Sequence, residues 1–246
     1  MTTMSATDKI FGTTPLDSQQ AALAKKTYAL LSISVVTAVV GGYFGSHSLA
    51  MVQLFSSGFG WLLAMVLLNV VPMIALWGSR QSPSLGILAL GLDGLVSGLT
   101  LSPVLFVANR LSEDVVPAAL GVTGAVCVAV TGYMMLTRQT FSAPKGLLTG
   151  MFMSLVCASV LNVFFHLELL HTVIAAGIGI FGTVMLVYAT SDVLNNRSYN
   201  NPVQGALMLF AALFNIFVSA LHLLLRLFGL SSATAFSVRT SMGHDQ

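Results

Sequence analysis

The acidic side chain of Asp93 stands well inside a long apolar stretch of this sequence. The stretch begins near Leu85, so the rise of a helix places Asp93 about 12 Å from its start. A carboxylate in such surroundings is costly unless it faces water or a partner, and it then binds a cation or carries a proton. The alternative is an acid that hydrogen bonds to a neighbouring helix and serves packing alone. The sequence leaves both interpretations open.

A second acid, Asp192, closes another apolar stretch in the segment Tyr188-Ala189-Thr190-Ser191-Asp192. It lies either at the polar boundary of that stretch or beside Asp93 in a shared, water-filled vestibule. In the second arrangement the two carboxylates would share a proton or bind a cation such as calcium. Asp93 and Asp192 are therefore the candidate residues of an ion or proton pathway.

Four further residues are expected to shape helix packing. Gly94 and Gly98 form a GxxxG pattern, which lets a second helix approach the backbone closely. Pro103 has no backbone N–H to donate, so it predicts a kink or a break in its helix. Asn215 can bridge helices through its side-chain amide.

Histidine and serine residues give weaker candidates for chemistry. His166 and His171 are not spaced to share one helix face, so no metal site is predicted. Ser219 and His222 are three residues apart, as a nucleophile and its base could be, but no GxSx loop surrounds the serine. We expect no enzymatic activity, no bound metal and no cofactor.

The sparsity of charge shows what kind of elements must hold these residues. Of 246 residues, 56% are hydrophobic and 7% are charged, whereas a soluble domain carries about 25% charged residues. A bilayer core of about 30 Å requires about 20 apolar residues in a helix. Because lipid offers no hydrogen bonds to the backbone, every span should be helical. The prediction is an all-α polytopic membrane protein with seven spans, at 27–44, 58–78, 85–108, 116–136, 146–165, 172–194 and 203–229.

The distribution of Lys and Arg predicts the orientation in the bilayer. A cytoplasmic N-terminus leaves Arg110, Arg226 and Arg239 on the outer side. It places the larger group on the cytoplasmic side, namely Lys9, Lys25, Lys26, Arg80, Arg138, Lys145 and Arg197. The expected organisation is a cytoplasmic tail over 1–26, a transmembrane domain over 27–229 and an outer tail over 230–246. A net charge of +2 is too small and too dispersed to suggest a nucleic-acid partner.

Four segments together resemble one known family. They are Lys26-Thr27-Tyr28-Ala29-Leu30-Leu31-Ser32, Gly98-Leu99-Thr100-Leu101-Ser102-Pro103-Val104, Tyr188-Ala189-Thr190-Ser191-Asp192-Val193-Leu194 and Leu213-Phe214-Asn215-Ile216-Phe217-Val218-Ser219. Their order and the seven-span layout are similar to the transmembrane Bax-inhibitor-motif family, in particular to its bacterial YccA-like branch. The resemblance implies a bundle in the bacterial inner membrane in which the seventh helix is central and surrounded by the other six.

The resemblance also implies two possible functions. Relatives carry an acid in each of the last two spans, and this proton-sensitive pair latches a calcium-permeable path. The corresponding positions here are Ala189 and Ala212, and Ser97 stands where the third span often has a glutamate. The YccA-like branch is also associated with the membrane protease FtsH. We therefore expect a non-enzymatic modulator of membrane-protein quality control that acts through a protease partner, or else a calcium or proton leak that uses Asp93 and Asp192.

Overall fold

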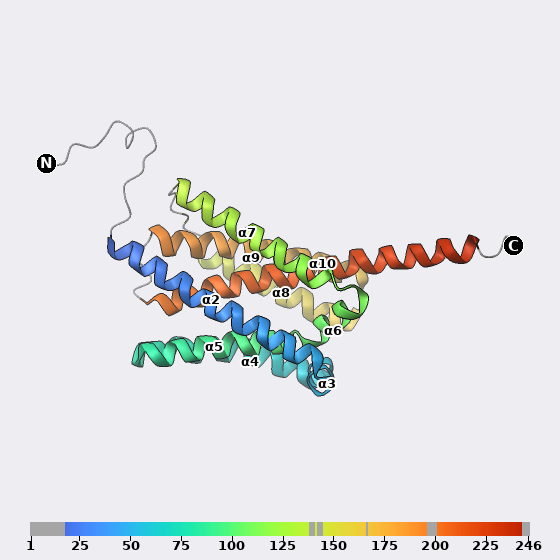
Figure 1. The fold of residues 1–246 in the computed structure, drawn as a ribbon, viewed down its shortest axis with the longest axis horizontal. Coiled ribbons are helices and arrows are strands. Elements are labelled where there is room, and N and C mark those ends of the chain that lie inside the picture. Colours follow the sequence, from blue (N-terminus) through green and yellow to red (C-terminus); the bar gives the residue numbers. More distant parts are fainter. Residues whose placement is uncertain (1–17, 138–140, 142–144, 166, 196–200, 243–246) are drawn as a thin grey trace.

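The protein is a bundle of helices. The computed structural model describes residues 18–137, 141, 145–165, 167–195 and 201–242, and no strand occurs among them. Consecutive long helices run in alternate directions, so that the first described helix begins and the last one ends at opposite ends of the bundle (Figure 1). The predicted all-α class is confirmed. The helices are α2 (Ser18–His47), α3 (Leu49–Ser56), α4 (Gly58–Gln81), α5 (Pro83–Thr100), α6 (Ser102–Leu111), α7 (Val115–Thr137), α8 (Lys145–Phe165), α9 (Glu168–Asn195) and α10 (Pro202–Met242).

Length and hydropathy identify the helices that can cross a membrane. Among the described residues, α2, α4, α7, α9 and α10 are each long and apolar enough. The pair α5 and α6, bent by 53°, counts as a sixth, broken span. The apolar part of α8, Gly146–Asn162, is shorter than these spans. A polytopic membrane protein is therefore confirmed, while the seventh crossing stays a prediction.

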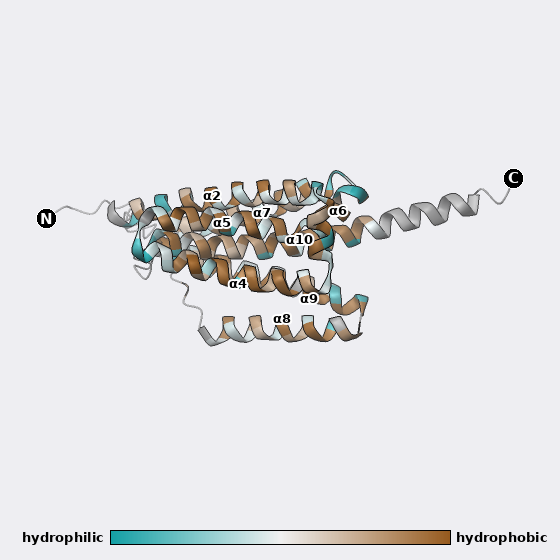
Figure 2. Ribbon diagram, turned by 90° about the horizontal axis from the view of Figure 1, so that it is seen from below, coloured by the Kyte–Doolittle hydropathy of each residue, from teal (hydrophilic) through white to brown (hydrophobic). Residues whose placement is uncertain are grey.

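Helix α10 occupies the centre of the bundle. Half of its most apolar window, 50%, is buried, compared with 12% to 33% in the other four long helices. It packs against α2, α4, α7, α9 and the broken pair α5 and α6, whereas α8 packs against α9 alone among the described helices. Figure 2 shows α8 set apart from the rest of the bundle. The expectation that six helices surround the last one is therefore met by five, because α8 lies outside.

The helix boundaries have local causes. The side chain of Ser57 accepts a hydrogen bond from the N–H of Gly60 at 2.9 Å, which caps the first turn of α4. Asn201 does the same for α10, since its Oδ1 accepts from the N–H of Val203 at 3.0 Å. The amide of Asn201 also donates to the Ser79 hydroxyl at 2.7 Å, which ties the start of α10 to the end of α4. At its other end α10 runs on to Met242, through most of the segment predicted as an outer tail (Figure 1).

Large apolar side chains cover the outside of the bundle. Phe59, Met73 and Val128 are each more than 70% exposed, as side chains that face lipid must be. Inside, the largest cluster joins α2, α7, α9 and α10 around Leu186, Leu209 and Phe210. Because lipid tails are as apolar as these side chains, close packing rather than the hydrophobic effect holds the helices together.

Candidate functional site

Asp93 lies on the buried face of α5. Spacing by three and four residues puts Leu90, Asp93 and Ser97 on one side of the helix, and Asp93 is 3% exposed. Close by, the Ser34 hydroxyl of α2 donates to the Leu90 carbonyl at 3.4 Å. No hydrogen bond reaches the Asp93 carboxylate from the part of the chain that the structure describes. A carboxylate in this position is costly while ionised, so a proton or a cation would stabilise it.

The glycines next to Asp93 bring two backbones together. A Cβ atom on Gly94 would overlap the Ser34 carbonyl oxygen, and one on Gly98 would overlap the Ala38 carbonyl oxygen. On the opposing helix, a Cβ on Gly41 would overlap the Leu95 carbonyl oxygen. Helices α2 and α5 therefore touch through main-chain atoms next to Asp93 and one turn beyond it. This contact is the close approach that the GxxxG pattern predicts.

The third span is broken just beyond this contact. Helix α5 ends at Thr100 and α6 begins at Ser102, so Leu101 is the residue at the break. Pro103 lies in the first turn of α6, where its missing N–H leaves no hydrogen bond unmade. The Ser102 hydroxyl donates to the Leu99 carbonyl, one of the groups that the break releases. The axis changes direction by 53° at this point.

Asp192 lies at the other end of the bundle and is covered by protein. It is 3% exposed although it stands in the last turn of α9. Its neighbour Val193 meets α2 and α10 at Gly205, where an added Cβ would lie 3.0 Å from Val193 Cγ2 and from Thr27 Cγ2. The Ser191 hydroxyl accepts a hydrogen bond from the N–H of Phe141 at 2.8 Å. Asp192 is thus part of an enclosed helix end and does not project into solvent.

The structure does not bring the two aspartates together. Helices α5 and α9 are not packed against each other, because α2 and α10 stand between them. Asp93 lies level with Ser34 of α2 and Asp192 lies level with Thr27. Seven residues of helix separate these two levels by about 10 Å. A shared vestibule would therefore have to run along α2 and could not be one compact site.

Ala189 and Ala212, by contrast, share one interface. Both are fully buried in the cluster between α9 and α10. An added Cβ on Gly182 would lie 3.0 Å from the Ala212 carbonyl oxygen and from Asn215 Cβ, which sets the register of this antiparallel pair. In that register Ala189 and Ala212 are about one turn apart. A second pair of carboxylates at these positions would be close neighbours, and this chain has methyl groups there instead.

Asn215 does not bridge helices. Its amide donates to the Ala211 carbonyl of its own helix at 2.9 Å. The side chain nevertheless packs on α9, because its Cβ lies against Gly182. Asn215 contributes to the α9 and α10 contact through shape, and the hydrogen bond stays inside α10.

Among the described residues, His171, His222 and Ser219 do not assemble into a reactive group. The rings of His171 and His222 lie 5.5 Å apart, and Arg226 pairs with Glu168 at 3.6 Å. His222 Nδ1 donates to the backbone carbonyl of Val218 at 2.7 Å and so is not directed at the Ser219 hydroxyl. Among the described residues no group of three metal-binding side chains occurs, and His166 lies outside those residues.

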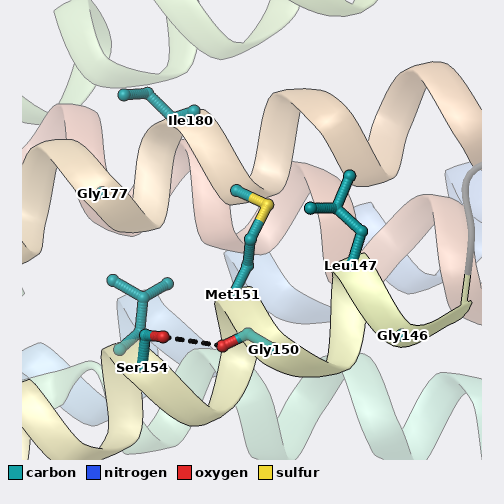
Figure 3. Close-up of a pocket in the computed structure, with 8 residues that line it drawn as sticks. Gly146, Leu147, Gly150, Met151, Ser154, Gly177 and Ile180 are labelled. Carbon is teal, nitrogen blue, oxygen red and sulfur yellow. Dashed lines mark hydrogen bonds between the residues drawn. The ribbon is translucent and has the colours of Figure 1, made fainter.

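Sequence reasoning missed two cavities. One, of about 510 Å³, lies between α8 and α9, and Figure 3 shows Met151 and Leu147 in it. The hydroxyl of Ser154 in its lining donates to the Gly150 carbonyl of the same helix at 2.8 Å, so this cavity offers a ligand little polarity. The second, of about 610 Å³, lies between α2, α6, α7 and α10. No sequence motif marks either one, because each depends on how the surfaces of separate helices fit together.

Fold and site together define a polytopic α-helical membrane protein with isolated acids buried in its bundle. The family model described as inhibitor of apoptosis-promoting Bax1 matches residues 20–232, and the chain belongs to this family. The resemblance seen in the sequence is thereby confirmed.

Relatives in several bacteria support the same assignment. The chain is 28% identical to an uncharacterized protein of Campylobacter jejuni over 84% of this chain and 89% of that protein. It is 29% identical to an uncharacterized protein of Neisseria meningitidis, over 83% of this chain and 91% of that one. It is also 30% identical to the modulator of FtsH protease YccA of Escherichia coli, over 45% of this chain and 50% of YccA. No solved structure matches the chain.

Proposed function

We propose that this protein modulates membrane-protein quality control by binding a membrane protease of the FtsH type, and that it catalyses no reaction itself. It would reside in the bacterial inner membrane with its N-terminus in the cytoplasm, as the distribution of Lys and Arg predicts. The similarity to the E. coli modulator of FtsH protease carries this proposal. The family membership over most of the chain supports it.

The packing of α2 suggests how such a protein would act on a protease. A protease that pulls on the N-terminal tail must first separate α2 from α5, which touch through main-chain atoms at Gly94 and Gly98. It must then separate α2 from the central helix α10. A chain that is engaged but hard to extract occupies the protease and slows the turnover of other substrates.

Co-purification from native membranes tests this proposal. The full chain, tagged after Gln246 and expressed at its natural level, should recover an FtsH-type protease in stoichiometric amount. Removal of residues 1–16 should abolish the recovery, whereas Asp93→Asn should leave it unchanged. A solitary full-length protein, together with unaltered half-lives of membrane-protein substrates in a deletion strain, would refute the proposal.

A cation or proton leak through Asp93 is the second candidate function. The observation in its favour is a buried carboxylate to which no described residue donates a hydrogen bond. The replacement of the family's acidic pair by Ala189 and Ala212 means that any such leak would rely on Asp93, with Asp192 about 10 Å away along the bundle.

Flux into proteoliposomes tests the leak. Calcium or proton entry should exceed that of empty vesicles and should fall at least fivefold in Asp93→Asn. Asp114→Asn is the matched control, because Asp114 is exposed in the turn between α6 and α7. Flux equal to that of empty vesicles, or equal in both variants, would remove this candidate.

A further inference from the structure

The cavity of about 610 Å³ has the form of a long groove on the side of the bundle. Its walls are α2 and α7, and the central helix α10 forms its floor with Phe210, Phe214 and Phe217. Helices α2 and α7 do not pack along it. They approach each other at one end, where the hydroxyls of Tyr28 and Thr131 lie 3.5 Å apart. The groove is thus closed at that end and open between the helices above it.

The groove opens sideways, toward lipid. Four of its lining residues, Val39, Tyr43, Leu120 and Val128, are also among the exposed apolar residues of the bundle surface. In a membrane protein that surface faces hydrocarbon, so the opening faces it as well. Whatever enters from this side must itself be soluble in the bilayer.

The length of the groove and the position of its polar end match one leaflet of the bilayer. On α2 the lining runs from Val35 to His47, which is about 18 Å at helical rise, and one leaflet is about 15 Å deep. Ser46, His47, Asn109 and Glu113 line one end of the groove. Toward Val35 the lining is apolar except for the Cys127 thiol and the Thr123 hydroxyl, which donates to the Ala119 carbonyl of its own helix at 2.8 Å. An ion does not match a long apolar groove, whereas a polar head with a hydrocarbon chain does.

The width of the groove favours an extended chain over a helix as its occupant. A volume of about 610 Å³ spread over about 18 Å gives a mean cross-section of about 34 Å². An α-helix about 10 Å across covers about 80 Å². An extended hydrocarbon chain fits this cross-section, whereas a helix of a second protein or a second copy would remain partly outside the groove.

The charge at the polar end selects the headgroup. Glu113 is the charged side chain in the lining, and neither Lys nor Arg lines the groove. The nearby Arg110 is turned away, with its guanidinium 5.1 Å from the centre of the Phe106 ring. We propose that the groove between α2 and α7 holds one acyl chain of a phospholipid whose amine-bearing headgroup lies against Glu113.

Filling the groove tests the acyl-chain site. Gly124 lines it and Gly121, one turn earlier on α7, does not, and a Cβ on either would meet no atom within 4 Å. Native mass spectrometry of the full chain, incubated with phosphatidylethanolamine, should show at least fivefold less bound lipid for Gly124→Leu than for Gly121→Leu. A second pair, Leu120→Trp in the lining and Val122→Trp outside it, repeats the comparison if Gly124→Leu fails to fold. Equal lipid binding within the pair that folds, or a lipid-free dimer, would overturn the proposal.

Exchanging the acid tests the headgroup. Wild-type protein should bind phosphatidylethanolamine at least threefold more than phosphatidylglycerol, and Glu113→Gln should abolish this preference. Asp114→Asn is the control, because the adjacent carboxylate does not line the groove. A preference for phosphatidylglycerol, or a preference that survives Glu113→Gln, would overturn the assignment of an amine-bearing lipid.

Discussion

The contact between α2 and α5 gives a quantitative prediction for Gly98→Ala. The new methyl group would overlap the Ala38 carbonyl oxygen and lie 2.6 Å from the Gly42 nitrogen. Both atoms belong to the main chain, so no side chain can turn aside and the helices must separate. Overpacking of this kind costs about 1 to 3 kcal/mol.

A matched variant removes the contribution of helix propensity. Alanine is more favourable than glycine inside a helix by about 1 kcal/mol, at Gly98 and elsewhere. Gly121→Ala makes the same exchange at a position where the added Cβ meets no atom within 4 Å. The difference between the two variants therefore isolates the contact, and we expect Gly98→Ala to be less stable than Gly121→Ala by about 2 kcal/mol.

Thermal unfolding in detergent, followed by circular dichroism, measures this difference. For a chain of this size 1 kcal/mol corresponds to about 2 to 4 °C, so the melting temperatures should differ by about 4 to 8 °C. Gly94→Ala combined with Gly98→Ala should cost less than the sum of the single effects, because one separation of α2 from α5 relieves both overlaps. If Gly98→Ala and Gly121→Ala agree within about 0.5 kcal/mol, the main-chain contact does not exist.

The remaining predictions concern single polar groups. Asp93→Asn should raise the free energy of unfolding in detergent by about 1 kcal/mol or more, because it removes a buried charge that no described residue pairs; a loss of stability would contradict this. Asn215→Ala should cost less than about 1 kcal/mol in the same assay, because the amide bonds to Ala211 of its own helix; a larger loss would indicate a bridge between helices. Glu168→Gln should change the melting temperature little at any salt concentration, since that side chain is 92% exposed. Arg226→Ala should lower the melting temperature more, because Arg226 also donates a hydrogen bond to the Glu168 carbonyl. Equal effects of the two variants would contradict this.

Patterns along the chain were sufficient for the local features. The break after Thr100 follows from Pro103, because a missing N–H acts on the turn that contains it. The pair Gly94 and Gly98, just after Asp93, also indicates a close helix contact, because small residues remove the steric barrier to it. The sequence could not tell which helix would approach, and the structure shows that it is α2.

Relations between distant helices were beyond the reach of those patterns. Asp93 and Asp192 are both buried, as acids inside apolar stretches can be, yet they stand on helices that are not packed together. Asn215 has a side-chain amide that could bridge two helices, but the amide donates a hydrogen bond to Ala211 of its own helix. Each outcome depends on the rotation of one helix about its axis against another, and hydropathy carries no information about that rotation.

The sequence by itself determined that this chain lies in a membrane, that its spans are helical and that acids are buried among them. These properties depend on the free-energy cost of placing charges and unpaired backbone groups in hydrocarbon. That cost applies to each segment on its own, whatever its neighbours in the fold. The tertiary structure decided that α10 is central, that α8 lies outside and that a groove separates α2 from α7. Those features arise from close packing among helices far apart in the chain, since lipid offers every apolar face an equally good alternative partner.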